Sequence, residues 1–410
     1  MPCGSWEQTT AWPYNRAVSG HDEDRAPAGT PLSDSILDDR RVAWGLIALL
    51  IVARVAAILW GLDRLPGDEA GTGLGNDARR FHDITTTAGR PYLDFPVEIP
   101  PVAVGAIELL DPGSSRTLAT NLAVAMLACD LATAAMLGLT WGRRTALTYL
   151  VLGAPLAIFV YFRLDLLSVA LAVAAVVAAR RGAQRTAGLT LAAAALTKVW
   201  PVVLLPLLAI HRRSRAVAYA LGGMAIGGVA WIWWGGSDGP AQVLTARHAT
   251  GWEVESPIGV VVWVITGEEP HLQGGAYRVG TIPPIVRAAV LALLVALVAW
   301  IWIRSKGDAA VAESWGAVGA VAAVLVMSTI LSHQYLTWLL PWAALTDSRA
   351  IRGWMLLAAS CAAAMLLSAS YASSAAVDAT IGILVLRDIA VIAMLVLVVR
   401  RFARAPVESH

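Results

Sequence analysis

Titratable side chains gather in one short stretch that separates two apolar segments. Residues 75–101 read GNDARRFHDITTTAGRPYLDFPVEIPP and contain Asp77, Arg79, Arg80, His82, Asp83, Arg90, Asp94 and Glu98. An ionised carboxylate facing a partly desolvated pocket can take a proton from an attacking hydroxyl, and Asp77 is the candidate for this role. The structural alternative is a helix N-cap that pairs with Arg80, three residues further on. The other charged groups nearby favour the chemical role.

The second half of this stretch is rich in proline. Pro91, Pro96, Pro100 and Pro101 impose an extended and stiff course on the chain. Such a segment can hold Asp94 and Glu98 in the wall of a cavity. The alternative is a rigid turn at the membrane surface whose acids are only solvated.

Two cations elsewhere could meet an anionic substrate. Lys198 is the only lysine inside an apolar segment, so it must reach water or bind an anion, and phosphate is the obvious candidate. The alternative for Lys198 is snorkelling to the interface. Arg163 either binds phosphate or pairs with nearby Asp165.

No metal or cofactor is indicated by the sequence. His248 and His333 are too far apart to suggest a metal pair, and no short His/Asp cluster exists. A hard cation bound by loop carboxylates remains an alternative.

The composition excludes a soluble globular protein. Of 410 residues, 57% are hydrophobic and 15% are charged, and the mean hydropathy is +0.64. Apolar runs long enough to cross a bilayer recur from Val42 to Val399, and none alternates with a period of two. We therefore predict an all-α polytopic membrane helix bundle with about 10–13 membrane helices, short or broken ones included. Nothing indicates a nucleic-acid partner, and the oligomeric state is left open.

The positions of the arginines predict the topology. Arginines at 40–41, 143–144 and 400–401 adjoin apolar runs, which places these ends in the cytoplasm. We therefore expect a disordered cytoplasmic tail at 1–41, a membrane domain at 42–400 and a second tail at 401–410. Residues 63–117 then form the first extracytoplasmic loop, which contains Asp77.

Two intramembrane features depart from simple helices. Basic clusters flank residues 187–210 on both sides, and Lys198, Trp200 and Pro201 lie near the middle. This pattern predicts two half-helices that enter the membrane and return. Asp130 lies inside a span, where it either lines a cavity or bonds a neighbouring helix.

The order of these features resembles the polyprenyl-phosphate-mannose-dependent α-mannosyltransferases of the C-type glycosyltransferase superfamily (GT-C). GRPYLDFPVEIPP looks like the family's Gly-x-Pro-Tyr-x-Asp-Phe…Glu-Tyr-Pro-Pro run, and Arg163 with Asp165 like its Arg-x-Asp. LTKVWPVVLLP, GWEVES and SHQYLTWLLP resemble its Lys-x-x-Pro, Gly-x-x-x-Glu-Ser and His/Gln-Tyr-Leu-x-Trp-Leu-x-Pro motifs. Phe81 and Ile99 stand where the family has tyrosines, which puts the sugar in doubt.

The resemblance implies an inverting hexosyltransferase, with mannose as the expected sugar, that is embedded in the plasma membrane. Its partners would be membrane lipids, a polyprenyl phosphate sugar donor and a glycolipid or glycan acceptor on the extracytoplasmic side. Asp77 would be the general base, and Lys198, Arg163 and His333 would bind the donor phosphate. The remaining cavity residues would be Arg80, Phe81, Tyr92, Asp94, Glu98, Asp165, Arg247, Glu255 and Tyr335.

Two alternatives remain. A lipid-glycan transporter or flippase could use the same basic cavity without catalysis, and it predicts that Asp77→Asn leaves function largely intact. The same class of enzyme could also transfer another sugar, such as a pentofuranose.

Overall fold

The computed structural model describes residues 40–63, 76–210, 214–245, 248–368 and 374–404. The chain divides into two compact units, Met1–Ala43 and Trp44–His410. Only four residues of the first unit are described, so the predicted tail at 1–41 lies almost wholly outside the described residues. The fold below is that of the second unit.

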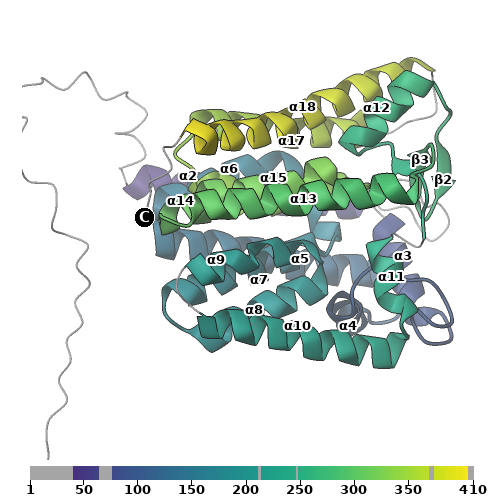
Figure 1. The fold of residues 1–410 in the computed structure, drawn as a ribbon, viewed down its shortest axis with the longest axis horizontal. Coiled ribbons are helices and arrows are strands. Elements are labelled where there is room, and N and C mark those ends of the chain that lie inside the picture. Colours follow the sequence, from purple (N-terminus) through teal and green to yellow (C-terminus); the bar gives the residue numbers. More distant parts are fainter. Residues whose placement is uncertain (1–39, 64–75, 211–213, 246–247, 369–373, 405–410) are drawn as a thin grey trace, which may run out of the picture. The chain divides into compact units, whose positions relative to one another are not determined.

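Long apolar helices form the bundle (Figure 1), which confirms the predicted all-α polytopic fold. Seven described helices are long and apolar enough to cross a membrane. They are α2 (Arg40–Asp63), α5 (Ser115–Trp141), α10 (Ser214–Gly235), α13 (Pro284–Ser305), the helix made by α14 (Ala309–Val311), the π-helix η4 (Ala312–Gly316) and α15 (Ala317–Met327), then α17 (Arg349–Ser368) and α18 (Ser374–Arg404).

Shorter elements fill the rest of the described chain. The α-helices are α3 (Asn76–Thr86), α4 (Pro101–Leu110), α6 (Arg143–Gly153), α7 (Asp165–Arg180), α8 (Gln184–Thr197), α9 (Leu205–Ile210), α11 (Asp238–Leu244), α12 (Pro257–Thr266) and α16 (Leu340–Leu345). The 3-10 helices are η1 (Ala154–Ile158), η2 (Val160–Phe162), η3 (Trp200–Leu204) and η5 (His333–Trp338).

A small antiparallel sheet, which the sequence did not reveal, lies at one end of the bundle (Figure 1). It contains β1 (Trp252–Glu253), β2 (His271–Gln273) and β3 (Ala276–Val279) in the order β1-β3-β2. Gly274 and Gly275 join β2 to β3 with φ of 60° and 81°, a conformation that suits glycine in a two-residue hairpin turn.

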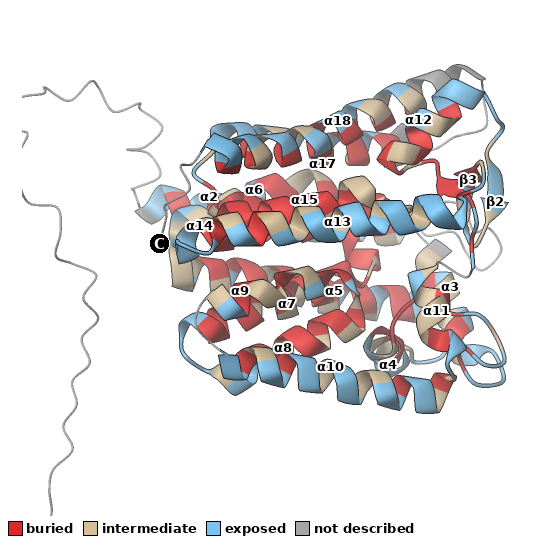
Figure 2. Cartoon of the chain, in the orientation of Figure 1, coloured by how far each residue is buried: buried red, intermediate tan, exposed pale blue. Residues whose placement is uncertain are grey.

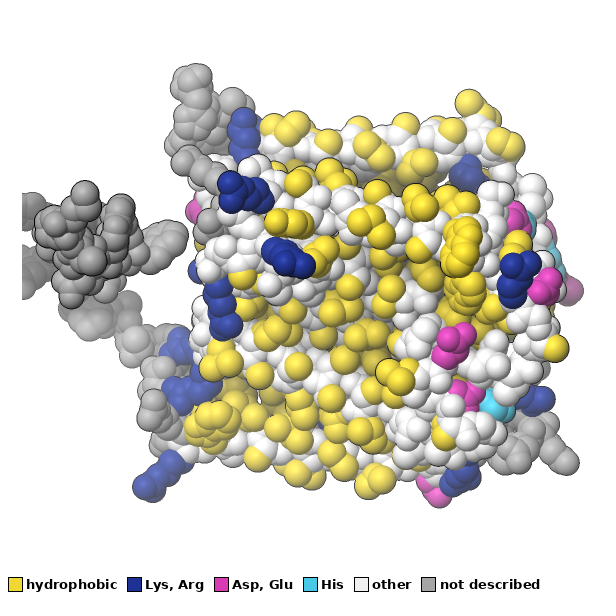
Figure 3. Space-filling model, turned by 90° about the horizontal axis from the view of Figure 1, so that it is seen from below, with side chains coloured by type: hydrophobic (Ala, Val, Ile, Leu, Met, Phe, Trp, Pro, Cys, Tyr) yellow, Lys and Arg dark blue, Asp and Glu magenta, His cyan; other side chains and the backbone are white. Residues whose placement is uncertain are grey.

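The bundle has a buried centre and an apolar outer surface. Figure 2 shows buried residues concentrated on α7 and α15, whereas α10 and α13 are exposed along much of their outer faces. On the face in Figure 3, hydrophobic side chains cover the middle, and most Lys and Arg lie at the end away from the sheet. An apolar band between two polar ends is what a membrane protein requires.

The predicted pair of half-helices is confirmed. Helix α8 ends at Thr197, and Lys198 is extended with φ −149° and ψ 139°. The chain then returns through η3 and α9 toward the end where α8 begins (Figure 1). Pro201 has no amide hydrogen to continue a helix, which explains the break at this point.

Asp130 bonds a neighbouring helix and does not line the cavity. Its carboxylate accepts hydrogen bonds from Arg54 Nε at 2.7 Å, Tyr149 Oη at 2.6 Å and Tyr161 Oη at 2.7 Å. This buried cluster joins α2, α5, α6 and η2. It satisfies a carboxylate that would otherwise be costly in the bundle interior.

Candidate active site

A cavity of about 290 Å³ lies at the sheet end of the bundle. Its wall is built from segments that are distant in sequence: α3, the turn before α4, the start of α7, the break after α8, β1, the β2–β3 turn and η5. The predicted site residues that line it are Asp77, Arg80, Phe81, Glu98, Arg163, Asp165, Lys198, Glu255 and Tyr335.

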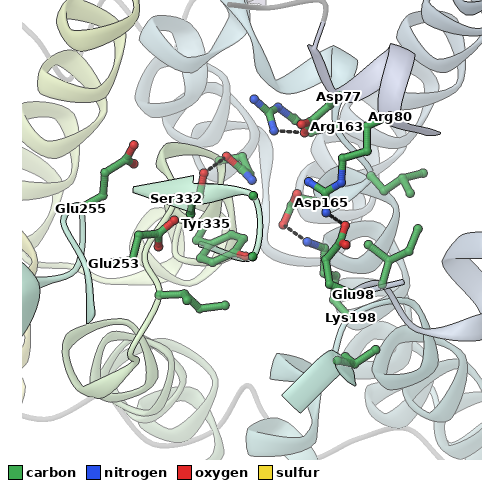
Figure 4. A pocket seen from close by; sticks show the side chains of 18 of the residues that line it. Asp77, Arg80, Glu98, Arg163, Asp165, Lys198, Glu253, Glu255, Ser332 and Tyr335 are labelled. Atoms are coloured by element: carbon green, nitrogen blue, oxygen red, sulfur yellow. Dashed lines mark hydrogen bonds and ion pairs between the residues drawn. The ribbon is translucent and has the colours of Figure 1, made fainter. Parts of the chain in front are cut away.

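Asp77 lies in the first turn of α3 and forms an ion pair with Arg163, which precedes α7 (Figure 4). Arg80 pairs instead with Glu98. The alternative in which Asp77 pairs with Arg80 therefore does not describe this structure. Both ion pairs lie in the cavity wall. The first joins α3 to the segment before α7, and the second joins α3 to the turn before α4.

Lys198 is held in the cavity wall by an acid and by aromatic rings. Its Nζ lies 3.6 Å from Asp165 Oδ1, which also accepts a hydrogen bond from Trp338 Nε1 at 2.8 Å. The ammonium also lies 5.1 Å from the centre of the Tyr335 ring, and that ring stacks on Trp338 at 4.2 Å. Lys198 thus reaches the cavity, and its role in binding phosphate stays a prediction.

Glu253 and Glu255 lie across the cavity from these three ion pairs (Figure 4). Glu253 accepts a hydrogen bond from the amide of Leu331 at 2.6 Å. Burial and the neighbouring charge of Glu255 raise the pKa of Glu253 to about 7. In the sequence, Glu253 was visible only as a letter of the GWEVES motif; its buried environment became visible only in the structure.

In Glu255, nearby cations outweigh the effect of burial on the pKa. Burial would raise its pKa, but His333 Nδ1 at 3.0 Å and Arg387 Nη1 at 3.7 Å outweigh burial and lower it. Glu255 therefore presents an ionised carboxylate to the cavity at neutral pH.

Three predicted residues do not line the cavity. Tyr92 is 2% exposed and packs against Trp231 and Trp234, with ring centres 5.6 and 5.7 Å away. Asp94 is exposed and accepts a hydrogen bond from the amide of Arg90 at 2.6 Å. The prolines stiffen the segment as expected, but a compact turn directs Asp94 back onto its own backbone.

The third is His333, which lies behind the wall and contacts the cavity residue Glu255. Its expected contact with the donor phosphate stays a prediction. Arg247 lies outside the described residues, so its predicted place in the wall is not described.

Sequence analysis missed the adjacent charges Arg387 and Asp388. They lie in α18, inside an apolar run, and are 0% and 4% exposed. Two charged residues within a membrane-spanning segment were the signal that could have found them.

Among the described residues, no group of three or more His, Cys, Asp and Glu side chains could hold a metal ion. The expectation of metal-independent chemistry stays a prediction.

An apolar helix bundle with a highly charged cavity at one end is typical of membrane proteins that act on polar substrates. The profile of glycosyltransferase family 87 matches residues 106–329, more than half of the 410-residue chain. The protein therefore belongs to glycosyltransferase family 87 and is a membrane glycosyltransferase. The matched region contains Arg163, Lys198 and Glu255, whereas Asp77 and His333 lie outside it.

Among solved structures, the crystal structure of ArnT from Cupriavidus metallidurans in the apo state is similar. The two chains are 14% identical, and the match covers 88% of this chain and 77% of that chain with a TM-score of 0.42. A search of curated proteins found no match.

Proposed function

We propose that this glycosyltransferase moves a hexose, specifically mannose, from a polyprenyl phosphate donor to a glycolipid or cell-envelope glycan acceptor. The observation that carries the proposal is the convergence of Asp77 with three cations, Arg80, Arg163 and Lys198, in one cavity. Such a cavity offers a base for a hydroxyl and cations for a phosphate.

The chemistry needs one base and no general acid. Asp77 takes the proton from an acceptor hydroxyl as its oxygen attacks the anomeric carbon. The bond from that carbon to the donor phosphate oxygen breaks, and the configuration inverts. The leaving group departs with the bonding electron pair as a phosphate monoester, and Arg163 and Lys198 stabilise its charge. Because guanidinium carries five N–H donors, Arg163 can contact Asp77 and the phosphate together.

A lipid-linked donor also suits the location of the site. The cavity lies at the end of the bundle opposite the one where most Lys and Arg gather in Figure 3. Since positively charged ends favour the cytoplasm, the cavity would face the extracytoplasmic side of the plasma membrane. Membership of a glycosyltransferase family favours catalysis over the transporter alternative.

Two cavity residues bear on which sugar the donor carries. Phe81 and Ile99 line the cavity without the hydroxyls that tyrosines would place there. A panel of donors is therefore needed, in which polyprenyl phosphates carry mannose, glucose or a pentofuranose.

The test uses the full chain reconstituted in lipid nanodiscs with each radiolabelled donor and a panel of envelope glycolipids. We expect label transfer from the mannose donor by the wild type and a loss of at least ~100-fold in kcat for Asp77→Asn, because general-base catalysis contributes on this order. Asp83→Asn is the matched control, since it makes the same chemical change at an exposed position of the same helix.

Equal transfer by wild type and Asp77→Asn would overturn the base assignment. Transfer only from the pentofuranose or glucose carrier would replace mannose as the sugar. Transfer from none of the donors would refute a polyprenyl phosphate donor.

A further inference from the structure

A buried arginine contacts the cavity residue Glu255 from α18, a helix that contributes no lining residue to the cavity. Arg387 lies in α18 with its side chain 0% exposed. A charge within a membrane helix is costly, so its partners must offset that cost. Its partners lie in three separate elements of the chain.

One partner makes the charge tolerable in the membrane. Asp388 Oδ1 accepts hydrogen bonds from Arg387 Nε at 3.0 Å and Nη2 at 2.9 Å. Were neutralisation the only purpose, this adjacent acid would suffice. The guanidinium nevertheless turns its remaining donors toward the cavity wall.

Those donors contact the backbone and the side chain of Glu255 and the ring of His333. Arg387 Nη2 donates to the Glu255 carbonyl oxygen, and Nη1 lies 3.7 Å from Glu255 Oε2 and 3.1 Å from His333 Nδ1. His333 Nδ1 in turn lies 3.0 Å from Glu255 Oε2. A rigid, permanently charged fork thus touches both a cavity carboxylate and the imidazole beside it.

The loop that carries Glu255 is fixed from its other side as well. Ser256 Oγ donates to the Glu253 carbonyl oxygen at 2.8 Å and accepts from the Gly259 amide at 3.1 Å, which caps α12. With Arg387 on the Glu255 carbonyl, both sides of this loop are tied to helices. The carboxylate therefore has a defined direction into the cavity.

We propose that Arg387 is a positioning residue, which keeps Glu255 ionised and oriented so that this carboxylate accepts hydrogen bonds from hydroxyls of the acceptor glycan. This inference rests on the proposed function. The proposal assigns one wall of the cavity to the donor and the opposite wall to the acceptor. The wall with Arg163 and Lys198 suits the donor phosphate. The wall with Glu253, Glu255 and Arg278, which lies opposite Glu253 in the sheet, offers both acceptors and donors of hydrogen bonds and suits a polyhydroxyl acceptor.

Several charged groups face Glu255 and decide its ionisation. They are His333 from η5, Arg387 and Asp388 from α18, Arg163 from the start of α7 and Glu253 from β1. Removing one cation from this set favours the protonated carboxyl. The acid side of the pH–rate profile should then move to higher pH.

The main variant is Arg387→Met/Asp388→Asn, which removes the ion pair without leaving an unpaired buried charge. Its matched control is Arg54→Met/Asp130→Asn, which removes another buried ion pair of the bundle, away from the cavity. Arg387→Lys keeps a cation but loses the planar fork. Each protein is studied as the full chain in nanodiscs.

The first readout needs no substrate. Carbodiimide with glycine ethyl ester labels protonated carboxyl groups, and peptide mass spectrometry measures labelling of Glu255 as a function of pH. We expect the midpoint to rise in the Arg387/Asp388 variant, because Arg387 contacts Glu255 directly whereas Asp388 contacts Arg387, so the lost cation outweighs the lost acid. The midpoint should stay unchanged in the control. An unchanged midpoint in both would overturn the inference.

The second readout is steady-state transfer. We expect KM for the acceptor to rise at least ~10-fold in the Arg387/Asp388 variant while KM for the donor changes less than about twofold, as loss of one charge-assisted contact predicts. Arg387→Lys should keep the wild-type labelling midpoint but raise KM for the acceptor. Wild-type kinetics in this variant would contradict the orienting role.

A wild type that transfers sugar from no polyprenyl phosphate would refute the proposed function alone. The labelling midpoint would still support or overturn the role of Arg387.

Discussion

Asp77 and Arg163 form an ion pair in the cavity wall, although they are far apart in the chain. Asp77 lies in the first turn of α3, and Arg163 precedes α7. The same wall contains the pairs Arg80–Glu98 and Lys198–Asp165. Each of these three cations is therefore partnered by an acid before substrate arrives. An incoming phosphate must share these cations with carboxylates, which makes the cavity selective for a ligand that brings its own negative charge.

Arg163 should determine the affinity for the donor. Arg163→Gln removes a cation next to the proposed phosphate position, so KM for the donor should rise at least ~10-fold and kcat should fall. Arg163→Lys should recover only part of the loss, because it lacks the bidentate fork. Initial rates against donor concentration measure both effects. Arg116→Gln, at an exposed position in the first turn of α5, is the control and should behave as wild type.

Glu253 should make stability depend on pH. Its folded pKa of about 7 lies above the ordinary value near 4.5, so the folded protein binds this proton more tightly than the unfolded chain. Stability should therefore fall as pH rises from about 4.5 to about 7. The loss is on the order of 3 kcal/mol, because one unit of pKa corresponds to about 1.4 kcal/mol.

Thermal unfolding of wild type and Glu253→Gln at pH 5 and pH 8 checks this effect. The variant should lose less stability than the wild type between the two pH values, whereas the exposed Glu268→Gln should lose as much as the wild type. An identical drop in all three proteins would show that Glu253 does not carry the dependence.

Gly259 should be intolerant of any side chain. A Cβ at this position would lie 1.9 Å from the Glu253 carbonyl oxygen, which is backbone and cannot move aside cheaply. Gly259→Ala should destabilise the protein by about 1–3 kcal/mol and lower transfer, because it displaces the loop that carries Glu253 and Glu255. Gly222→Ala is the control, since a Cβ there meets nothing within 4 Å. Equal melting temperatures for the two variants would contradict this account.

Arg54 should contribute to the stability of the fold and not to sugar transfer. Arg54→Met leaves the buried Asp130 without its cation, which typically costs 3–5 kcal/mol. Arg54→Met/Asp130→Asn should be more stable than the single variant, because no uncompensated charge remains. Denaturation of the purified proteins tests this order. A single variant as stable as the double would indicate that the two tyrosines satisfy Asp130 alone.

Much of the architecture could be predicted from the sequence. The apolar runs predicted the membrane helices, and the sequence around Lys198 and Pro201 predicted the broken helix that brings Lys198 to the cavity. These predictions succeeded because length, hydropathy and the geometry of proline act locally. The small sheet was missed, since strands of two to four residues are too short to show a period.

The site was only partly predictable for a related reason. Asp94 carries a carboxyl group like Glu98 and lies on the same stiff segment, yet of the two only Glu98 reaches the cavity, because a turn after Gly89 folds Asp94 back. The position of His333 behind Glu255 depends in the same way on how η5 packs against the loop that follows β1.

The sequence alone determined that this protein is a helical membrane bundle and which ionisable groups it must accommodate, because the cost of placing each residue in a bilayer is set largely by the residue itself. Only the tertiary structure decided the partners. It paired Asp77 with Arg163 and not with Arg80, and it brought Arg387 to Glu255. The energy of two charges depends on the distance between them, and these distances are set when segments far apart in the chain pack together.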